Sequence, residues 1–96
     1  MKQAIRIRTL PATDTKPTRL SVKSDTGKTM VKSVDYFQRI AQERKINRRH
    51  TIENKYFAAA ILMCEILSIC PDKMLLATFE NDVYVTLIDY RSYKVR

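Results

Sequence analysis

The sequence predicts an α+β fold, with an antiparallel sheet of about five strands and a long apolar helix packed on one face of it. Two groups of segments near the ends of the chain alternate between apolar and polar residues, as strands do. Two segments of helical character lie between them. The expected order is strand, strand, strand, helix, helix, strand, strand. A chain of 96 residues suffices for a single domain, residues 1–96, with one continuous core.

The first two strands follow from alternation. In "AIRIRTL" (residues 4–10) two isoleucines alternate with Arg6 and Arg8. Residues 11–18 contain two prolines and are expected to form a loop. In "RLSVKS" (residues 19–24) Leu20 and Val22 are expected to face the core.

A hairpin and a third strand are expected next. "DTGK" (residues 25–28) is typical of a hairpin loop, with Asp25 bonding its own backbone and Gly27 taking a positive φ. "TMVKSV" (residues 29–34) is the third strand, and its alternation leaves the inward face open. If Val31 faces the core, the residues that face outward are Lys28, Met30 and Lys32.

The two helices have recognisable boundaries. Ser33 is a suitable N-cap for an amphipathic helix that runs to about Lys45. "INRRH" has no apolar periodicity and is expected to connect the helices. Thr51 is a suitable N-cap for the second helix, expected at 52–70 and ended by Pro71. This helix is apolar nearly all round, which favours burial against the sheet and also homodimerisation.

The C-terminal hairpin is expected within "MLLATFENDVYVTLIDY" (residues 74–90), with a two-residue turn at Asn81 and Asp82. One face of its second strand is wholly apolar. The other contains Tyr84 and Tyr90 among its residues. This strand is therefore expected to be central in the sheet or covered on its far side.

Several classes of protein are disfavoured. The N-terminus has no apolar segment typical of a signal peptide, and the apolar run at 56–70 contains a glutamate and is too short to span a bilayer. Cys64 and Cys70 are expected on different faces of the helix as buried, reduced thiols, which favours a cytoplasmic protein without membrane contact. The one histidine, His50, lies in a basic connection without a nucleophile motif, and its role stays open. The acidic residues are scattered, and neither a nucleophile motif nor a metal-ligand spacing occurs. We therefore expect no enzyme, no catalytic residues, no metal and no cofactor.

Positive charge is concentrated in the first half of the chain. Residues 1–50 hold 13 Lys and Arg against 4 Asp and Glu, or +9, whereas residues 51–96 sum to −1. Alternation brings many of these cations to the sheet face away from the core helix, where they suit DNA or RNA phosphates, with a log–log salt slope of about −5 for six contacts on duplex. The candidate nucleic-acid-binding residues are Arg6, Arg8, Arg19, Lys23, Lys28 and Lys32, extended by Arg44, Lys45, Arg48 and Arg49.

Two functions stay open at this point. The first three strands lack the aromatic residues on which single-stranded bases stack, and Tyr84 and Tyr90 serve only if their face joins the basic one. The alternative is a small protein-binding inhibitor or adaptor, such as an anti-defence protein, that docks on an acidic surface of a host protein. For nucleic acid, replacing Arg6 and Arg19 is expected to weaken binding more than replacing Arg48 and Arg49.

The stretch "IRIRTLPATDTKPTRLSV", followed by a polar hairpin and by "HTIENKYFAAAILMCEIL", resembles a family of small uncharacterised proteins encoded by bacterial prophages, plasmids and integrative elements. The matching residues are Leu10, Pro11, Thr15, Lys16, Arg19, Leu20, His50 and Ala58–Ala60. Pro17 departs from the pattern, where glycine is usual, and the connection from Asp35 to His50 is longer. The resemblance implies a mobile-element origin and a cytoplasmic accessory role, and no activity carries over.

Overall fold

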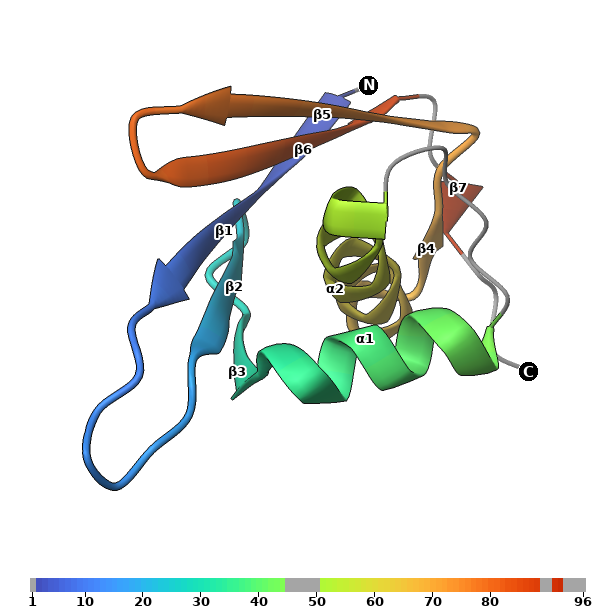
Figure 1. Cartoon of the computed structure of the whole chain (residues 1–96). Helices are drawn as coiled ribbons and strands as arrows, with labels where there is room; N and C mark the ends of the chain where they lie inside the picture. Colours follow the sequence, from blue (N-terminus) through green and yellow to red (C-terminus); the bar gives the residue numbers. More distant parts are fainter. Residues whose placement is uncertain (1, 45–50, 89–90, 93–96) are drawn as a thin grey trace.

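The computed structural model describes residues 2–44, 51–88 and 91–92, and it has the predicted α+β architecture (Figure 1). Five antiparallel strands form one sheet in the order β3-β2-β1-β6-β5. Their bounds are β1 Lys2–Leu10, β2 Arg19–Ser24, β3 Thr29–Ser33, β5 Lys73–Phe79 and β6 Asp82–Ile88. The helices are α1 Val34–Glu43 and α2 Thr51–Leu67, and the short strands β4 Ile69–Cys70 and β7 Arg91–Ser92, which we did not predict, pair with each other.

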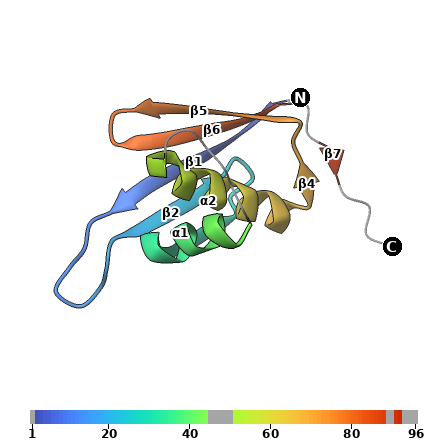
Figure 2. The ribbon, with the colours of Figure 1, turned by 45° about the vertical axis from the view of Figure 1, so that its right-hand side comes forward.

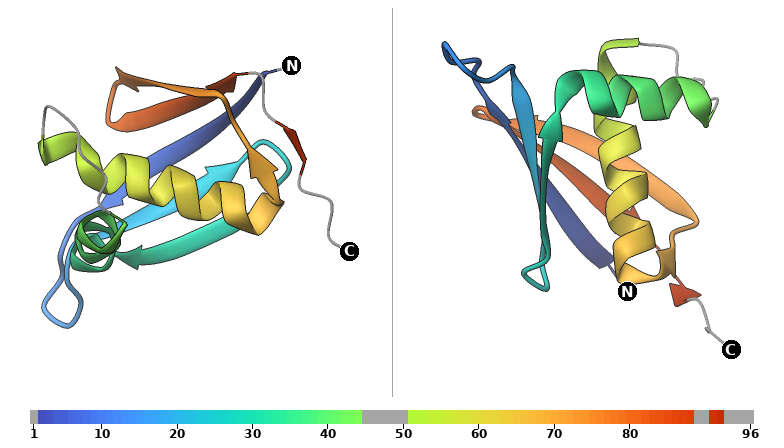
Figure 3. Two further views of the ribbon diagram at one scale, coloured as in Figure 1. Left: turned by 90° about the vertical axis from the view of Figure 1, so that its right-hand side faces the viewer. Right: turned by 90° about the horizontal axis from the view of Figure 1, so that it is seen from below.

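Both helices lie on the same side of the sheet. The twisted sheet curves around α2, and α1 crosses α2 near the β3 edge (Figures 1 and 2). In the views of Figure 3 neither α1 nor α2 lies on the opposite side of the sheet. We call the side that carries the helices the helix face and the opposite side the outer face.

The core lies between the helix face and α2. The alternating positions Ile5 and Ile7 of β1 and the predicted inward residues of β2 are almost completely buried. On β6 the apolar face is buried in the same way, and the strand is central, between β1 and β5. Ala58–Ala60 of α2 have no exposed surface, because side chains this small let the helix backbone lie close to the sheet.

The second helix ends earlier than predicted. It stops at Leu67, and Ser68 takes the left-handed conformation with φ 57° while its N–H donates to the carbonyl of Glu65. Cys70 precedes a proline and so favours an extended backbone, which here includes Ile69 and forms β4. The prediction that Cys70 belongs to the helix was therefore wrong, although both cysteines are unpaired thiols.

The first helix begins as predicted. The Ser33 hydroxyl accepts a hydrogen bond from the N–H of Tyr36, which satisfies a backbone donor in the first turn of α1. The helix ends at Glu43, two residues before the predicted limit.

Both hairpins form, but their turns differ from the prediction. Phe79 pairs with Asp82, so the two-residue turn is Glu80–Asn81 and Asp82 belongs to β6. In the N-terminal hairpin Gly27 has φ 93°, as predicted. The side chain that closes this turn is Ser24, whose hydroxyl accepts from the N–H of Lys28.

The face of β3 that the sequence left open is settled by the structure, and Val31 does not face the core. Met30 pairs with Val22 and packs against the core, whereas Val31 pairs with Ser21 and is 42% exposed. Lys32 therefore lies on the helix face. The hairpin loop between Ser24 and Lys28, which pair with each other, has three residues. A loop of two or four residues would turn Val31 toward the core, so the length of this loop fixes the register.

Some predictions lie outside the described residues, among them the connection at 45–50 and the position of Tyr90. The described helices include none that is both long and apolar enough to cross a membrane. Ile66 of α2 is 49% exposed, and homodimerisation through this helix stays a prediction.

Candidate nucleic-acid interface

The register of the sheet brings four predicted cations to the outer face. Arg6 of β1 lies directly opposite Lys23 of β2, and Arg8 lies opposite Ser21. Arg19 begins β2 on the same face, where it pairs with Leu10. Neighbouring strands are about 4.8 Å apart, so these residues form a compact basic cluster over β1 and β2.

An open pocket of about 320 Å³ lies beside this cluster, and it is lined by Ala4, Arg6, Lys23, Ser24, Asp25 and Tyr84. We predicted that the side chain of Asp25 would bond its own backbone, and this prediction was wrong. Its Oδ2 accepts from the N–H of Ala4 at 2.8 Å, which ties the hairpin loop to β1. Within residues 2–44 and 51–88, neither Arg6 nor Lys23 has an ion-pair partner. Two cationic groups, one ring and the carboxylate of Asp25 therefore line the same pocket.

Arg8 is largely neutralised by an acid from β6. Its Nε donates to Asp82 Oδ1 at 3.0 Å, and its second terminal nitrogen donates to Oδ2 at 3.2 Å. The hydrogen bond from Arg8 lowers the pKa of the Asp82 carboxyl, and the charge of Arg6 lowers it further. The same hydrogen bond raises the pKa of Arg8. Arg8 therefore links β1 to β6 on the outer face, and its charge is less available to an anion than the charges of Arg6 and Lys23.

Arg19 occupies the edge of the cluster and is half-buried. Its Nε is buried and has no hydrogen-bond partner among the described residues. A guanidinium in this position retains donors for a phosphate or carboxylate oxygen.

Three other predicted cations are not brought to this cluster. Lys28 lies in the hairpin loop, before β3 begins. Lys32 is on the helix face, with its Nζ 5.5 Å from the centre of the Tyr36 ring. Arg44 follows α1 as its C-cap and pairs with Glu65 of α2 at 2.7 Å, an interaction that raises the pKa of Arg44. The remaining candidates, Lys45, Arg48 and Arg49, are outside the described residues.

Aromatic side chains share the basic face, a possibility that the sequence left open for Tyr84 and did not indicate for Phe79. Tyr84 lies opposite Arg6 across the β1–β6 pair, so its face does join the basic one. Phe79 pairs with Asp82 and is 66% exposed on the same face. The alternation of β6 could have indicated the side of Tyr84, but only the pairing with β1 places it next to the cations.

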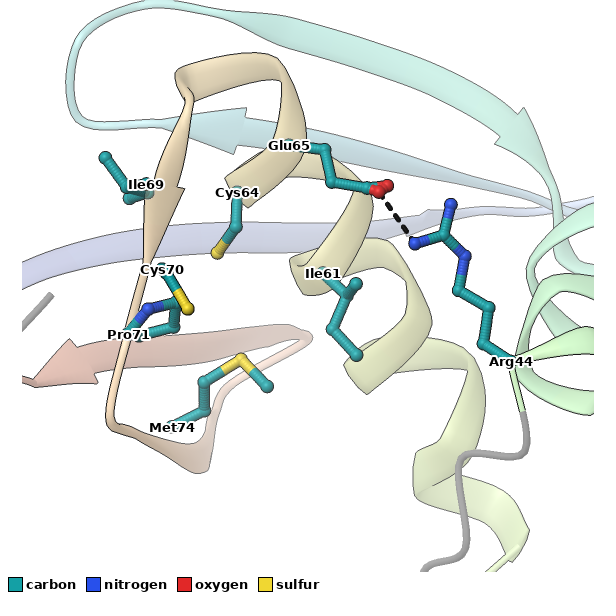
Figure 4. Close-up of a pocket in the computed structure, with 8 residues that line it drawn as sticks. All are labelled: Arg44, Ile61, Cys64, Glu65, Ile69, Cys70, Pro71 and Met74. Atoms are coloured by element: carbon teal, nitrogen blue, oxygen red, sulfur yellow. Dashed lines mark hydrogen bonds and ion pairs between the residues drawn. The ribbon is translucent and has the colours of Figure 1, made fainter. Parts of the chain in front are cut away.

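A second cavity, of about 310 Å³, lies on the other side of the sheet, between α2 and β4 (Figure 4). It contains the thiols of Cys64 and Cys70, and the Arg44–Glu65 ion pair lies at its rim. Burial raises the pKa of Cys64 to about 11, so this thiol is protonated at neutral pH. It is therefore a poor nucleophile.

The described residues contain no group of three or more His, Cys, Asp or Glu side chains placed to hold a metal ion. Comparison with protein-family models, with curated proteins and with solved structures found no match. The resemblance to proteins of prophages and plasmids thus stays a prediction from sequence motifs.

Proposed function

We propose that this protein is a non-enzymatic accessory protein that binds nucleic acid through the outer face of its sheet. The observation that supports the proposal is the cluster of Arg6, Arg19 and Lys23, three cations on one face with no acid within hydrogen-bonding reach among the described residues. Phosphates bind such clusters with release of counterions, largely independently of sequence. A mobile-element origin and a cytoplasmic location belong to the same proposal and rest on the sequence motifs.

The expected salt dependence is smaller than the sequence alone suggests. Lys32 lies on the helix face, Lys28 lies in a loop, and Arg8 is paired with Asp82. Three to four phosphate contacts then give a log–log salt slope of about −3 on duplex rather than −5.

The test is a titration of labelled DNA and RNA, followed by fluorescence anisotropy at about 50 and 200 mM salt. We expect micromolar binding at the lower salt. Lys23→Gln is expected to weaken it, whereas Lys32→Gln is the matched control, because it removes the same charge from the neighbouring strand on the opposite face. The double change of Arg6 and Arg19 to Gln should weaken binding more than the double change of Arg48 and Arg49. Absence of micromolar binding to any nucleic acid would refute the proposal.

A second function is favoured by one observation. Leu75 and Phe79 of β5 are 46% and 66% exposed, and they place apolar surface on the same face as the cations, one strand beyond β6. Such a mixed surface also suits an acidic patch on a host protein. A pull-down from nuclease-treated host lysate separates the two functions, because a partner that is retained only through nucleic acid is lost. The protein-binding alternative would be supported by two results together. The wild-type protein binds no oligonucleotide, and it retains a host partner that the Phe79→Ala variant loses.

A further inference from the structure

Two aromatic rings share the outer face with the cations: Tyr84 lies directly opposite Arg6, and Phe79 lies opposite Asp82, the partner of Arg8. Tyr84 lies between strands that present Arg6 on one side and Ala77 on the other. Phe79 lies two residues further along β5 and exposes 66% of its surface. A phenylalanine this exposed gains little from the protein's own core, so its ring is available to a ligand.

The chemistry of the rings distinguishes between forms of nucleic acid. A duplex offers its grooves and phosphates, while the flat faces of its bases are covered by neighbouring base pairs. Single strands can turn their bases outward and stack them on aromatic rings, in a way that tolerates any sequence. Aromatic rings on a face that also carries cations therefore favour a single strand over a duplex.

The register also sets how many bases fit. Tyr84 pairs with Ala77, which makes Phe79 its diagonal neighbour, at about 7–8 Å. That spacing is about twice the 3.4 Å rise of stacked bases. Each ring thus suits one unstacked base, and the small side chain of Ala77 leaves the surface between them open.

We infer that the ligand is a single strand of DNA or RNA, with one base stacked on Tyr84, a second on Phe79, and backbone phosphates on Arg6 and Lys23. This inference rests on the proposed function and narrows it to single strands. The pocket where base and phosphate contacts meet is lined by Arg6, Lys23 and Tyr84, and also by Asp25, whose Oδ2 accepts from the N–H of Ala4.

The experiment compares labelled single-stranded DNA, single-stranded RNA and a duplex of the same length and sequence at about 50 mM salt. We expect a single strand to bind more tightly than the duplex, and the DNA and RNA arms to show which one the face prefers. Phe79→Ala and Tyr84→Ala should each weaken single-strand binding about 5- to 100-fold and change duplex binding less than about twofold.

Two controls isolate stacking from folding and from general apolar contact. Tyr84→Phe keeps the ring and should retain single-strand affinity, so it separates a lost ring from a disturbed fold. Leu75→Ala removes an exposed apolar side chain from β5, on the same face as Phe79, without removing a ring. This variant should bind single strands nearly as tightly as wild type.

The outcomes separate the inference from the proposed function. If the duplex binds as well as or better than the single strands, or Phe79→Ala leaves single-strand binding unchanged, the inference is overturned while the proposed function stands. If no nucleic acid binds at all, both fall.

Discussion

At the scale of single residues, the ion pair between Arg8 and Asp82 limits how strongly the outer face attracts an anion. Asp82→Asn removes the negative charge and leaves Arg8 with donors for a phosphate. We expect this variant to bind nucleic acid more tightly, on the order of 3- to 10-fold at about 50 mM salt, with a salt slope steeper by about 0.7–0.9.

Glu43→Gln is the matched control for this gain. It makes the same charge change at an exposed carboxylate at the end of α1, on the helix side of the sheet. Equal gains for both variants would mean that only net charge matters and that the outer face is not the binding surface.

The same ion pair makes part of the stability depend on pH. Because Arg8 lowers the pKa of Asp82 in the folded protein, the pair stabilises the fold at pH values above the ordinary pKa of an aspartate. This stabilisation is lost as the pH falls through the lowered pKa. We therefore expect Asp82→Asn to lower the melting temperature near neutral pH and to differ little from wild type in strong acid. A constant difference at all pH values in thermal melts would contradict this.

At the scale of elements, the end of α2 offers a stabilising substitution. Ser68 adopts φ 57°, a conformation that costs side-chain-bearing residues about 1–2 kcal/mol. After subtraction of the extra unfolded-state entropy of glycine, Ser68→Gly should stabilise the protein by about 0.5–1 kcal/mol. Thermal unfolding should show a melting temperature higher by about 2–8 °C.

The control is Ser21→Gly, the same change within extended β2. Glycine in a strand interior has no conformational advantage and loses more entropy on folding, so this variant should be less stable than wild type. A Ser68→Gly variant that melts lower than wild type would show that the serine side chain contributes more than its backbone conformation costs.

The strands differ in how well their bounds and faces can be predicted from the sequence. Alternation located β2 to the residue, because apolar and polar positions are unambiguous there. It failed for β3, where Met30 and Val31 are adjacent and each parity contains an apolar residue. The three-residue hairpin loop ending in Gly27 was the informative signal, since it sets the pairing of the strand that follows.

The candidate site was less predictable than the elements. Arg6 and Lys23 could be assigned to one face because Arg6 lies between the core residues Ile5 and Ile7, and Lys23 follows the core residue Val22. Tyr84 and Arg6 are neighbours because β1 pairs with β6, and these strands are far apart in the chain. The alternation within each strand does not indicate which strands pair. The same long-range pairing brings Asp82 to Arg8, so the neutralised cation was also unpredictable.

At the scale of the whole molecule, β1 joins the two halves of the sheet. It pairs with β2 on one side and β6 on the other. Without β1 the sheet is divided into the β2–β3 and β5–β6 hairpins, and an isolated two-stranded hairpin is at best marginally stable in water. We expect a variant without residues 2–10 to lose cooperative unfolding and the dispersed amide signals of a folded protein in an NMR spectrum.

An insertion of four Gly and Ser residues after Asp14 is the control. It lengthens the exposed loop between β1 and β2 and should cost only about 0.4 kcal/mol. Retained cooperative unfolding in the truncated protein would show that the β5–β6 hairpin and the helices fold without β1.

The position of β1 also has a consequence for synthesis in the cell. Its partner β2 follows within a few residues, but its other partner begins only at Asp82. At ordinary rates of translation, β1 waits about 4–15 s before β6 is made. During this interval one side of β1 has no strand partner, and such an unpaired edge can pair with another chain.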